Sequence, residues 1–170
     1  MAFSNVSNER LALVHPELAR RVRNLEAMLS AGGVQIQVAQ GIRTASQQDA
    51  LYAEGRTLPG KRVTDARGFQ SNHVIGCAVD VFPEDSHGQP DWNASHPDWQ
   101  RILAAAPACG LRDGICWHDM PHLELQEIPT EPTAAIQETC KLEGVPAAWK
   151  ALDVPTFDSP ALGPAGSTDA

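Results

Sequence analysis

The sequence predicts an α+β fold built around a single hydrophobic core. Apolar residues recur at helical spacing over residues 16–30, while residues 34–38 and 78–82 alternate between apolar and polar side chains, as half-buried strands do. The chain has 170 residues, of which 42% are hydrophobic, so it can form one core without a disulfide or a second domain.

Two helices are expected near the N-terminus. Ser7 is suited to cap a short helix through Val14, and Pro16 suits the first turn of the next helix. That second helix is amphipathic over residues 16–30 and is expected to end at Gly32-Gly33. Its apolar stripe consists of Leu18, Val22, Leu25 and Leu29.

A strand over residues 34–38 is expected to lead into a third helix. Thr44 and Gln47 have the spacing of a capping box, which predicts a helix through about Glu54. Arg43 then lies at a strand-to-helix junction, a place from which side chains often project into a site. A lone arginine is more often one half of a surface ion pair, so both interpretations of Arg43 stay open at this point.

A long loop follows over residues 55–70, where glycine, proline and charged residues occur without any period. Loops of this length in compact domains are often functional, so this one could shape a substrate groove, or it could simply be mobile. After the strand at 78–82, a helix is expected over residues 97–106, and strands are expected over 114–118 and 122–125.

The composition changes beyond Ile128, where prolines interrupt the chain repeatedly. We therefore divide the chain into a domain over residues 1–128 and an extension over residues 129–170. The extension is expected to hold at most a short helix over residues 133–142, and its last dozen residues are expected to be disordered.

The formal net charge of -8 argues against several classes of partner. No basic stripe favours nucleic acid or an anionic membrane surface, and no run of eighteen apolar residues predicts membrane insertion. The N-terminus lacks a basic region followed by an apolar core, so we expect synthesis in the cytoplasm without a secretion signal.

Two histidines and two aspartates could form a zinc site with its own proton-transfer group. A catalytic zinc site has three protein ligands and one open position, and His73, Asp80 and His122 could be those ligands. Asp119 is expected one short loop before the strand of His122, free of the metal and able to act as the base. A structural zinc site, or no metal at all, stays an alternative on spacing alone.

Several neighbours of these residues have less certain roles. Glu124 is the rival of Asp119, and we expect it to orient a ligand because it should point the same way as His122 on the strand. His118 precedes His122 by four residues, as in a helical zinc pair, but Pro121 disfavours a helix there, so we expect His118 to line the pocket and bind substrate. Arg43 could stabilise an oxyanion or bind a substrate carboxylate.

The cysteines are expected to be buried free thiols. The four cysteines form no CxxC pair, and a disulfide framework is not expected in a chain without a secretion signal. Cys77 lies between two proposed ligands, but an alternating strand should turn it away from Asp80, so we exclude it from the site.

Three segments together resemble a known family. SNHVIGCAVDV, residues 71–81, resembles the SxHxxGxAxD signature of zinc peptidases that include D-alanyl-D-alanine carboxypeptidases and dipeptidases of the VanY and VanX kind. DMPHLEL, residues 119–125, resembles their acid-x-x-His element, and QGIRT, residues 40–44, resembles the segment with their active-site arginine. The acid of the second element is Asp119, an aspartate as in compact phage endolysins that act as L-alanyl-D-glutamate endopeptidases. The carboxypeptidases have glutamate at that position. The likeness covers roughly residues 7–126.

The resemblance implies a role for each matching residue. The Zn²⁺ ligands would be His73, Asp80 and His122. Asp119 would be the catalytic base and Arg43 the oxyanion or carboxylate contact, and Ser71 would contact substrate or support a ligand. The implied fold is the small antiparallel sheet flanked by helices that the hedgehog signalling domain shares with these D,D-peptidases, and residues 1–128 would be the catalytic domain.

The function implied is that of a phage or prophage endolysin that hydrolyses an amide in the peptidoglycan stem peptide by metal-activated water. We expect a monomer that waits in the host cytoplasm, reaches the cell wall with the help of a holin-type partner, and prefers the L-Ala-D-Glu bond. A D-alanyl-D-alanine carboxypeptidase and a non-catalytic, zinc-stabilised wall-binding module are the alternatives. The family pattern accounts for nothing in residues 129–170.

Overall fold

The computed structural model describes residues 3–117 and 119–158, and at its centre lies a four-stranded antiparallel sheet with the order β1-β2-β4-β3. The strands are β1 (Ile36–Gln40), β2 (Ala78–Pro83), β3 (Leu111–Gly114) and β4 (Asp119–Leu125). In the register of β2 and β4, Asp80 lies opposite His122 and Ala78 lies opposite Glu124. The expected α+β class with a small antiparallel sheet is confirmed.

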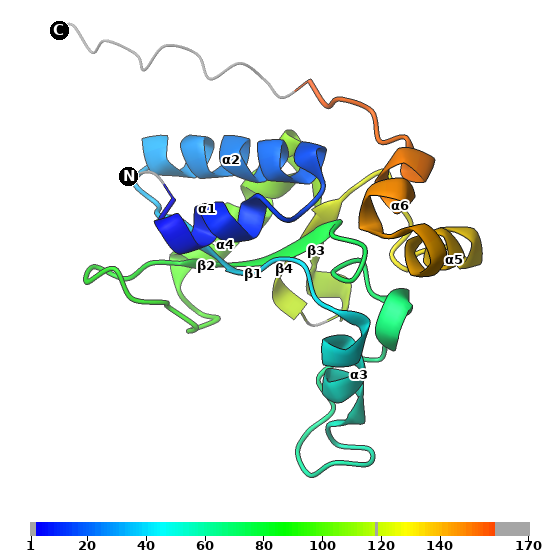
Figure 1. Cartoon of the computed structure of the whole chain (residues 1–170). Coiled ribbons are helices and arrows are strands. Elements are labelled where there is room, and N and C mark those ends of the chain that lie inside the picture. The colour runs from blue at the N-terminus through cyan, green and yellow to red at the C-terminus, as the bar shows by residue number, and fades with distance from the viewer. Residues whose placement is uncertain (1–2, 118, 159–170) are drawn as a thin grey trace, which may run out of the picture.

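Helices surround this sheet on several sides (Figure 1). They are α1 (Asn5–Leu11), α2 (Pro16–Ala31), α3 (Ala45–Ala53), α4 (Pro97–Ala105), α5 (Ala134–Glu143) and α6 (Val145–Leu152). Helices α1, α2 and α4 cover one face of the sheet, whereas α5 and α6 pack against each other as a hairpin at one end (Figure 1). Helix α3 projects from the body together with residues 54–70, and we call this segment the arm (Figure 1).

The two faces of the sheet have different characters, because successive side chains of a strand point to opposite faces. The face under the helices carries the fully buried side chains of Val79, Val81, Leu123 and Leu125. The opposite face carries the polar side chains of Asp80, His122 and Glu124. Sheet pairing alone therefore gathers polar groups from β2 and β4 on one surface.

The expected helices in the first part of the chain are confirmed, with one correction at a cap. Helix α2 and the Thr44–Gln47 capping box of α3 occur where predicted, and so does α4. The predicted cap Ser7 is wrong, because Ser4 caps α1, which ends at Leu11. Ser7 lies one turn inside the helix, where its buried hydroxyl donates to Gln37 Oε1 at 2.7 Å.

The strands differ from expectation at two places. Strand β1 begins and ends two residues later than predicted. The strand predicted over residues 114–118 is wrong: β3 ends at Gly114, because the Asp113 carboxylate accepts a hydrogen bond from the Ile115 amide and turns the chain into a 3-10 helix. Asp119 does not lie in a loop but begins β4 itself.

The C-terminal part holds more structure than the sequence predicted. Helix α5 confirms the short helix, and α6 was not expected. Side chains of both helices, Ile136, Cys140 and Ala148, join the same buried cluster as the sheet. The division of the chain at residue 128 stays a prediction, and the last dozen residues lie outside the described part of the chain.

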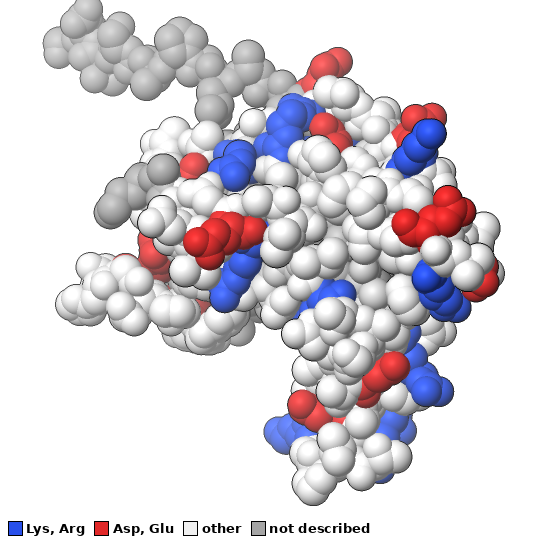
Figure 2. Space-filling model, viewed as in Figure 1, with Lys and Arg blue, Asp and Glu red and all other residues white. Residues whose placement is uncertain are grey.

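Most of the cysteines are buried, and charged side chains of both signs lie on the surface (Figure 2). Cys77, Cys109 and Cys140 are buried free thiols as expected, but Cys116 is exposed. On the face shown in Figure 2, acidic and basic side chains are interspersed, with several basic ones on the arm. No helix among the described residues is both long and apolar enough to cross a membrane.

Candidate metal centre

A tight turn between the arm and β2 places the first candidate ligand, His73. The Gly76 amide donates to His73 O at 3.1 Å, and the Cys77 amide donates to Asn72 O at 2.8 Å. Gly76 has a φ of 68°, a left-handed conformation that glycine adopts without strain. The turn buries His73 and directs its ring toward the polar face of the sheet.

The three predicted ligands come together at this point. His73 Nε2 lies 3.2 Å from His122 Nδ1 and 3.2 Å from Asp80 Oδ1, and the last two atoms are 3.7 Å apart. Ligand atoms around a tetrahedral zinc ion lie ~3.3 Å from one another, given zinc–ligand bonds of about 2.0–2.1 Å. The triangle therefore fits a metal ion that binds all three residues.

Hydrogen bonds on the far side of each ring select the tautomers. His73 Nδ1 lies 2.8 Å from Gly41 O, and His122 Nε2 lies 3.1 Å from Glu124 Oε2, so each of these nitrogens carries the proton in a neutral ring. The lone pairs of His73 Nε2 and His122 Nδ1 then point at each other and at the Asp80 carboxylate. Converging lone pairs require a cation between them, either a proton or a metal.

The Asp80 carboxylate supports the same conclusion. Its Oδ1 is buried and has no hydrogen-bond partner among the described residues, whereas a metal would satisfy it. Burial acts to raise the pKa of Asp80, but the adjacent imidazoles of His73 and His122 outweigh it and hold the pKa below its usual range. For His122, burial acts to lower the pKa, and Asp80 and Glu124 raise it to about 9 in the metal-free protein.

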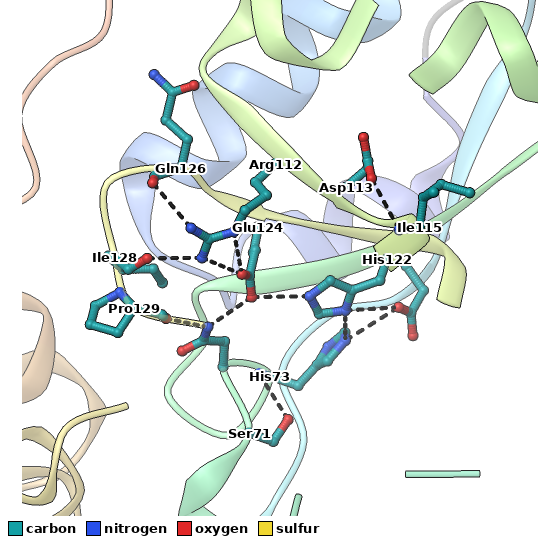
Figure 3. A network of polar contacts seen from close by, with 12 residues as sticks. Ser71, His73, Arg112, Asp113, Ile115, His122, Glu124, Gln126, Ile128 and Pro129 are labelled. Atoms are coloured by element: carbon teal, nitrogen blue, oxygen red, sulfur yellow. Dashed lines mark hydrogen bonds and ion pairs between the residues drawn. The ribbon is translucent and has the colours of Figure 1, made fainter. Parts of the chain in front are cut away.

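A buried network behind His122 holds that ring in place (Figure 3). Arg112 donates to Glu124 Oε1 through Nε at 2.9 Å, and Asn72 Nδ2 donates to Glu124 Oε2 at 2.7 Å. Glu124, with 1% of its surface exposed, thus presents Oε2 to His122 as an orienting partner. Asn72 and Arg112 were not predicted. The pairing of β3 with β4 brings Arg112 to Glu124, and the path of the 71–77 turn brings Asn72 there.

Arg43 is tied to the metal centre through Asp80. Its Nη2 donates to Asp80 Oδ2 at 2.9 Å, and its Nη1 donates to Gln48 Oε1 at 3.0 Å. Gln48 is buried and in turn donates to Thr64 Oγ1 and Ala66 O of the arm. Gln48 was not predicted from the sequence. The signal that could have indicated it is its position in the first turns of α3, five residues after Arg43.

Asp119 reaches the site through an irregularity in the β3–β4 pairing. Gly114 pairs with Asp119, whereas the preceding residue Asp113 pairs with Leu123, so β4 bulges between these positions. A Cβ at Gly114 would lie 2.9 Å from His122 Cβ and 3.2 Å from Asp119 Cβ, which shows how closely the bulge packs. Asp119 is exposed at the rim, yet desolvation and the Asp80 charge raise its carboxyl pKa, against the opposing effect of His122, His73 and Arg43.

A pocket of about 620 Å³ opens over these groups. Its lining includes the candidate ligands, Asp119, Arg43 and Ser71, with Arg62 and Thr64 from the arm and Thr130 from the segment after β4. Ser71 Oγ also accepts a hydrogen bond from the His73 amide at 3.3 Å. The predicted substrate contact His118 lies outside the described residues, and Cys77 lies outside the ligand cluster.

Comparison with known proteins finds relatives over most of the chain. Residues 11–111 match the family model VanY, D-alanyl-D-alanine carboxypeptidase. The chain is 31% identical over 122 residues to the peptidoglycan L-alanyl-D-glutamate endopeptidase CwlK of Bacillus subtilis (strain 168), a match that covers 66% of this chain and 73% of that protein.

Two solved structures are similar to this one. The L-Ala D-Glu endopeptidase ChiX of Serratia marcescens has a TM-score of 0.54 at 27% identity, over 74% of this chain and 90% of that chain. The LD-carboxypeptidase LdcB, in a structure that concerns peptidoglycan recognition, has a TM-score of 0.54 at 16% identity, over 74% of this chain and 64% of that chain. The second likeness concerns the fold alone, and together they confirm the fold expected from the motifs.

Proposed function

This chain belongs to the VanY family, and we propose that it is a zinc peptidase that hydrolyses the L-alanyl-D-glutamate bond of peptidoglycan stem peptides. The observation that carries the proposal is the convergence of His73 Nε2, Asp80 Oδ1 and His122 Nδ1 on one point. The relatives from Bacillus subtilis and Serratia marcescens are L-alanyl-D-glutamate endopeptidases by name, which supports the choice of bond.

The donor set suits zinc. Two imidazole nitrogens and one carboxylate oxygen are ligands of catalytic zinc sites, which keep one position open. When bound, zinc supplies Lewis acidity and lowers the pKa of a coordinated water to about 7. His73, Asp80 and His122 would hold the ion, and Glu124 keeps the proton of His122 on Nε2 so that Nδ1 can bind the metal.

We propose Asp119 as the proton-transfer group. It lines the pocket beside the ligands without belonging to the ligand triangle. Its raised pKa makes the carboxylate a better proton acceptor than an ordinary aspartate. We assign to it removal of a proton from the attacking water and transfer of that proton to the leaving amine.

Arg43 and Ser71 have supporting positions in this scheme. Arg43 orients Asp80 by binding Oδ2, which leaves Oδ1 directed at the two imidazoles. Each terminal nitrogen of a guanidinium carries two N–H groups, so Arg43 has donors left for the carbonyl oxygen of a substrate in the pocket that it lines. Ser71 also lines the pocket and is close enough to the His73 turn to contact bound peptide.

The biological setting is part of the proposal. The aspartate at position 119 resembles the acid of phage endolysins, so we propose a phage or prophage lysis enzyme. It would be a monomer held in the host cytoplasm until a holin-type partner opened the way to the cell wall.

Digestion of purified peptidoglycan tests the reaction directly. Sacculi incubated with the protein should release new amino termini, and mass spectrometry of the muropeptides should show cleavage between L-Ala and D-Glu. Activity should disappear with a chelator and return with zinc. Release of terminal D-Ala instead would contradict the endopeptidase and establish a D-alanyl-D-alanine carboxypeptidase, the candidate that the family model's description favours. Complete absence of turnover by the zinc-loaded protein would leave the non-catalytic wall-binding module.

A further inference from the structure

The C-terminal hairpin of α5 and α6 lies beyond residues 11–111, which match the family model, yet it touches the turn that carries His73. The Trp149 indole of α6 donates a hydrogen bond from Nε1 to Ile75 O at 2.7 Å. The same ring packs on the next residue, since a Cβ at Gly76 would lie 3.1 Å from Trp149 Cζ2. Trp149 therefore packs on the turn at Ile75 and Gly76.

A second residue completes this contact from the other end of the chain. The His15 amide donates to Gly76 O at 2.7 Å, and the His15 ring meets the Trp149 ring edge-on with centroids 5.5 Å apart. Two successive carbonyls of the turn, those of Ile75 and Gly76, are thus bound by groups from outside it. No backbone amide of the turn donates to either carbonyl, and within the turn Ile75 O receives only a weak hydrogen bond from the Cys77 thiol, whose Sγ lies 3.7 Å away.

The geometry of this turn determines where the His73 ring lies. His73 O accepts hydrogen bonds from the backbone amides of Arg43 and Gly76. These two bonds fix the backbone of the candidate ligand His73. Without the indole N–H, Ile75 O would keep only the weak thiol donor of Cys77. A buried carbonyl without a good donor costs about 1–3 kcal/mol, and a shift of the turn would relieve that cost. A shift of the turn would move Nε2 of His73 relative to Asp80 and His122.

The extension also reaches the metal centre by a second path. Pro129 O, just before α5, accepts a hydrogen bond of 2.9 Å from Asn72 Nδ2, and the same nitrogen donates to Glu124. The segment after residue 128 therefore contacts the turn through Trp149 and the Glu124 network through Pro129.

We propose that Trp149 is a positioning residue for the metal centre, and that the α5–α6 hairpin belongs to the metal-binding unit. The indole holds the Ile75–Gly76 peptide so that His73 Nε2 meets the other two ligand atoms. The inference rests on the proposed function in that the ion is zinc.

The test compares zinc affinity in Trp149→Phe, which keeps an aromatic ring but removes the N–H, with Trp92→Phe, the same change at an exposed tryptophan outside the site. The zinc dissociation constant is measured by competition with a chromogenic chelator. Loss of a partner that orients a ligand costs 10–100-fold in affinity, so Trp149→Phe should raise the constant about tenfold and Trp92→Phe should leave it unchanged. Hydrogen exchange at the Gly76 and Cys77 amides should be faster in Trp149→Phe alone.

The outcomes separate the two proposals. Wild-type protein that binds no zinc contradicts the proposed function. Wild-type protein that binds zinc, with equal affinity in Trp149→Phe, overturns the positioning role, as does a lowered melting temperature of Trp149→Phe with unchanged zinc affinity. If the phenylalanine variant does not fold, Trp149→Met, a flexible apolar side chain without an N–H or O–H donor, replaces it, and unchanged zinc affinity in that variant overturns the positioning role.

Discussion

The Arg43 guanidinium donates a 2.9 Å hydrogen bond to Oδ2 of Asp80, the carboxylate oxygen opposite the one beside His73 and His122. This contact joins the arginine and the ligand motifs into one unit. Arg43 therefore contacts the carboxylate of a candidate ligand, whereas the sequence suggested either a surface ion pair or a contact with substrate.

Replacement of Arg43 by lysine should weaken zinc binding as well as hydrolysis. A lysine has a single nitrogen and cannot bind Asp80 and Gln48 at once in the planar geometry of a guanidinium. We expect zinc affinity to fall about tenfold or more, the usual cost of removing a group that orients a metal ligand. Chelator competition measures this, with the exposed Arg23→Lys as control; equal affinities would show that Arg43 acts on substrate only.

Asp119→Asn should separate catalysis from metal binding. The amide keeps the size of the side chain but cannot accept the proton of the attacking water, so kcat should fall by about 10²–10⁴-fold. The zinc content should remain near one ion per chain, because Asp119 is not among the three ligands. Muropeptide digestion and metal analysis measure the two quantities, with Asp98→Asn on α4 as control. Full activity in Asp119→Asn would contradict the assigned base.

Arg62→Gln should weaken recognition of an acidic stem peptide. Arg62 lines the pocket, and its guanidinium has no ion pair with any described residue. The D-glutamate of the proposed substrate carries a free carboxylate next to the scissile amide, and a charge-assisted hydrogen bond contributes about 1.5–3 kcal/mol. KM should therefore rise about tenfold or more for free-acid stem peptides but change little for peptides amidated at that carboxylate.

The neighbouring residue offers a matched control for this prediction. Lys61→Gln removes the same charge from the arm at a side chain that does not line the pocket. If both variants lose affinity equally, the effect is one of overall charge and Arg62 has no specific contact.

Stability at acid pH should depend on Glu17, which does not line the pocket. Burial acts to raise the pKa of Glu17, but hydrogen bonds from Arg20, Arg21 and the Phe157 amide outweigh it and lower the pKa to about 2. A carboxyl whose pKa is depressed on folding stabilises the protein above its unfolded pKa. That contribution, on the order of 3 kcal/mol, should be lost as the pH falls from about 4.5 to about 2.

Urea unfolding across this pH range measures the effect. Glu17→Gln should be less stable than the wild type at pH 7 and should lose less stability on acidification, whereas the exposed Glu9→Gln should follow the wild-type curve. Parallel curves for wild type and Glu17→Gln would show that the interactions of Glu17 do not contribute to folding.

The sequence predicted those features that depend on neighbours in the chain. The apolar period of α2 and the Thr44–Gln47 capping box are local patterns, and both elements occur where expected. Spacing alone left a structural zinc site or no metal open, and the resemblance to family motifs singled out His73, Asp80 and His122, which the structure brings together. Ser7 shows the limit of local reasoning: it looked like a cap, but its contact with Gln37 across 30 residues drew it into the core.

Only the tertiary structure decided how the pieces meet. The register that sets Asp80 opposite His122, the bulge at Gly114 that brings in Asp119, and the contact of Trp149 with the His73 turn all join residues distant in the chain. Such contacts depend on strand pairing and on close packing between elements, which no local period encodes. The sequence by itself thus determined the locally patterned elements and the candidate ligands, and tertiary packing determined the site's geometry and its supporting residues.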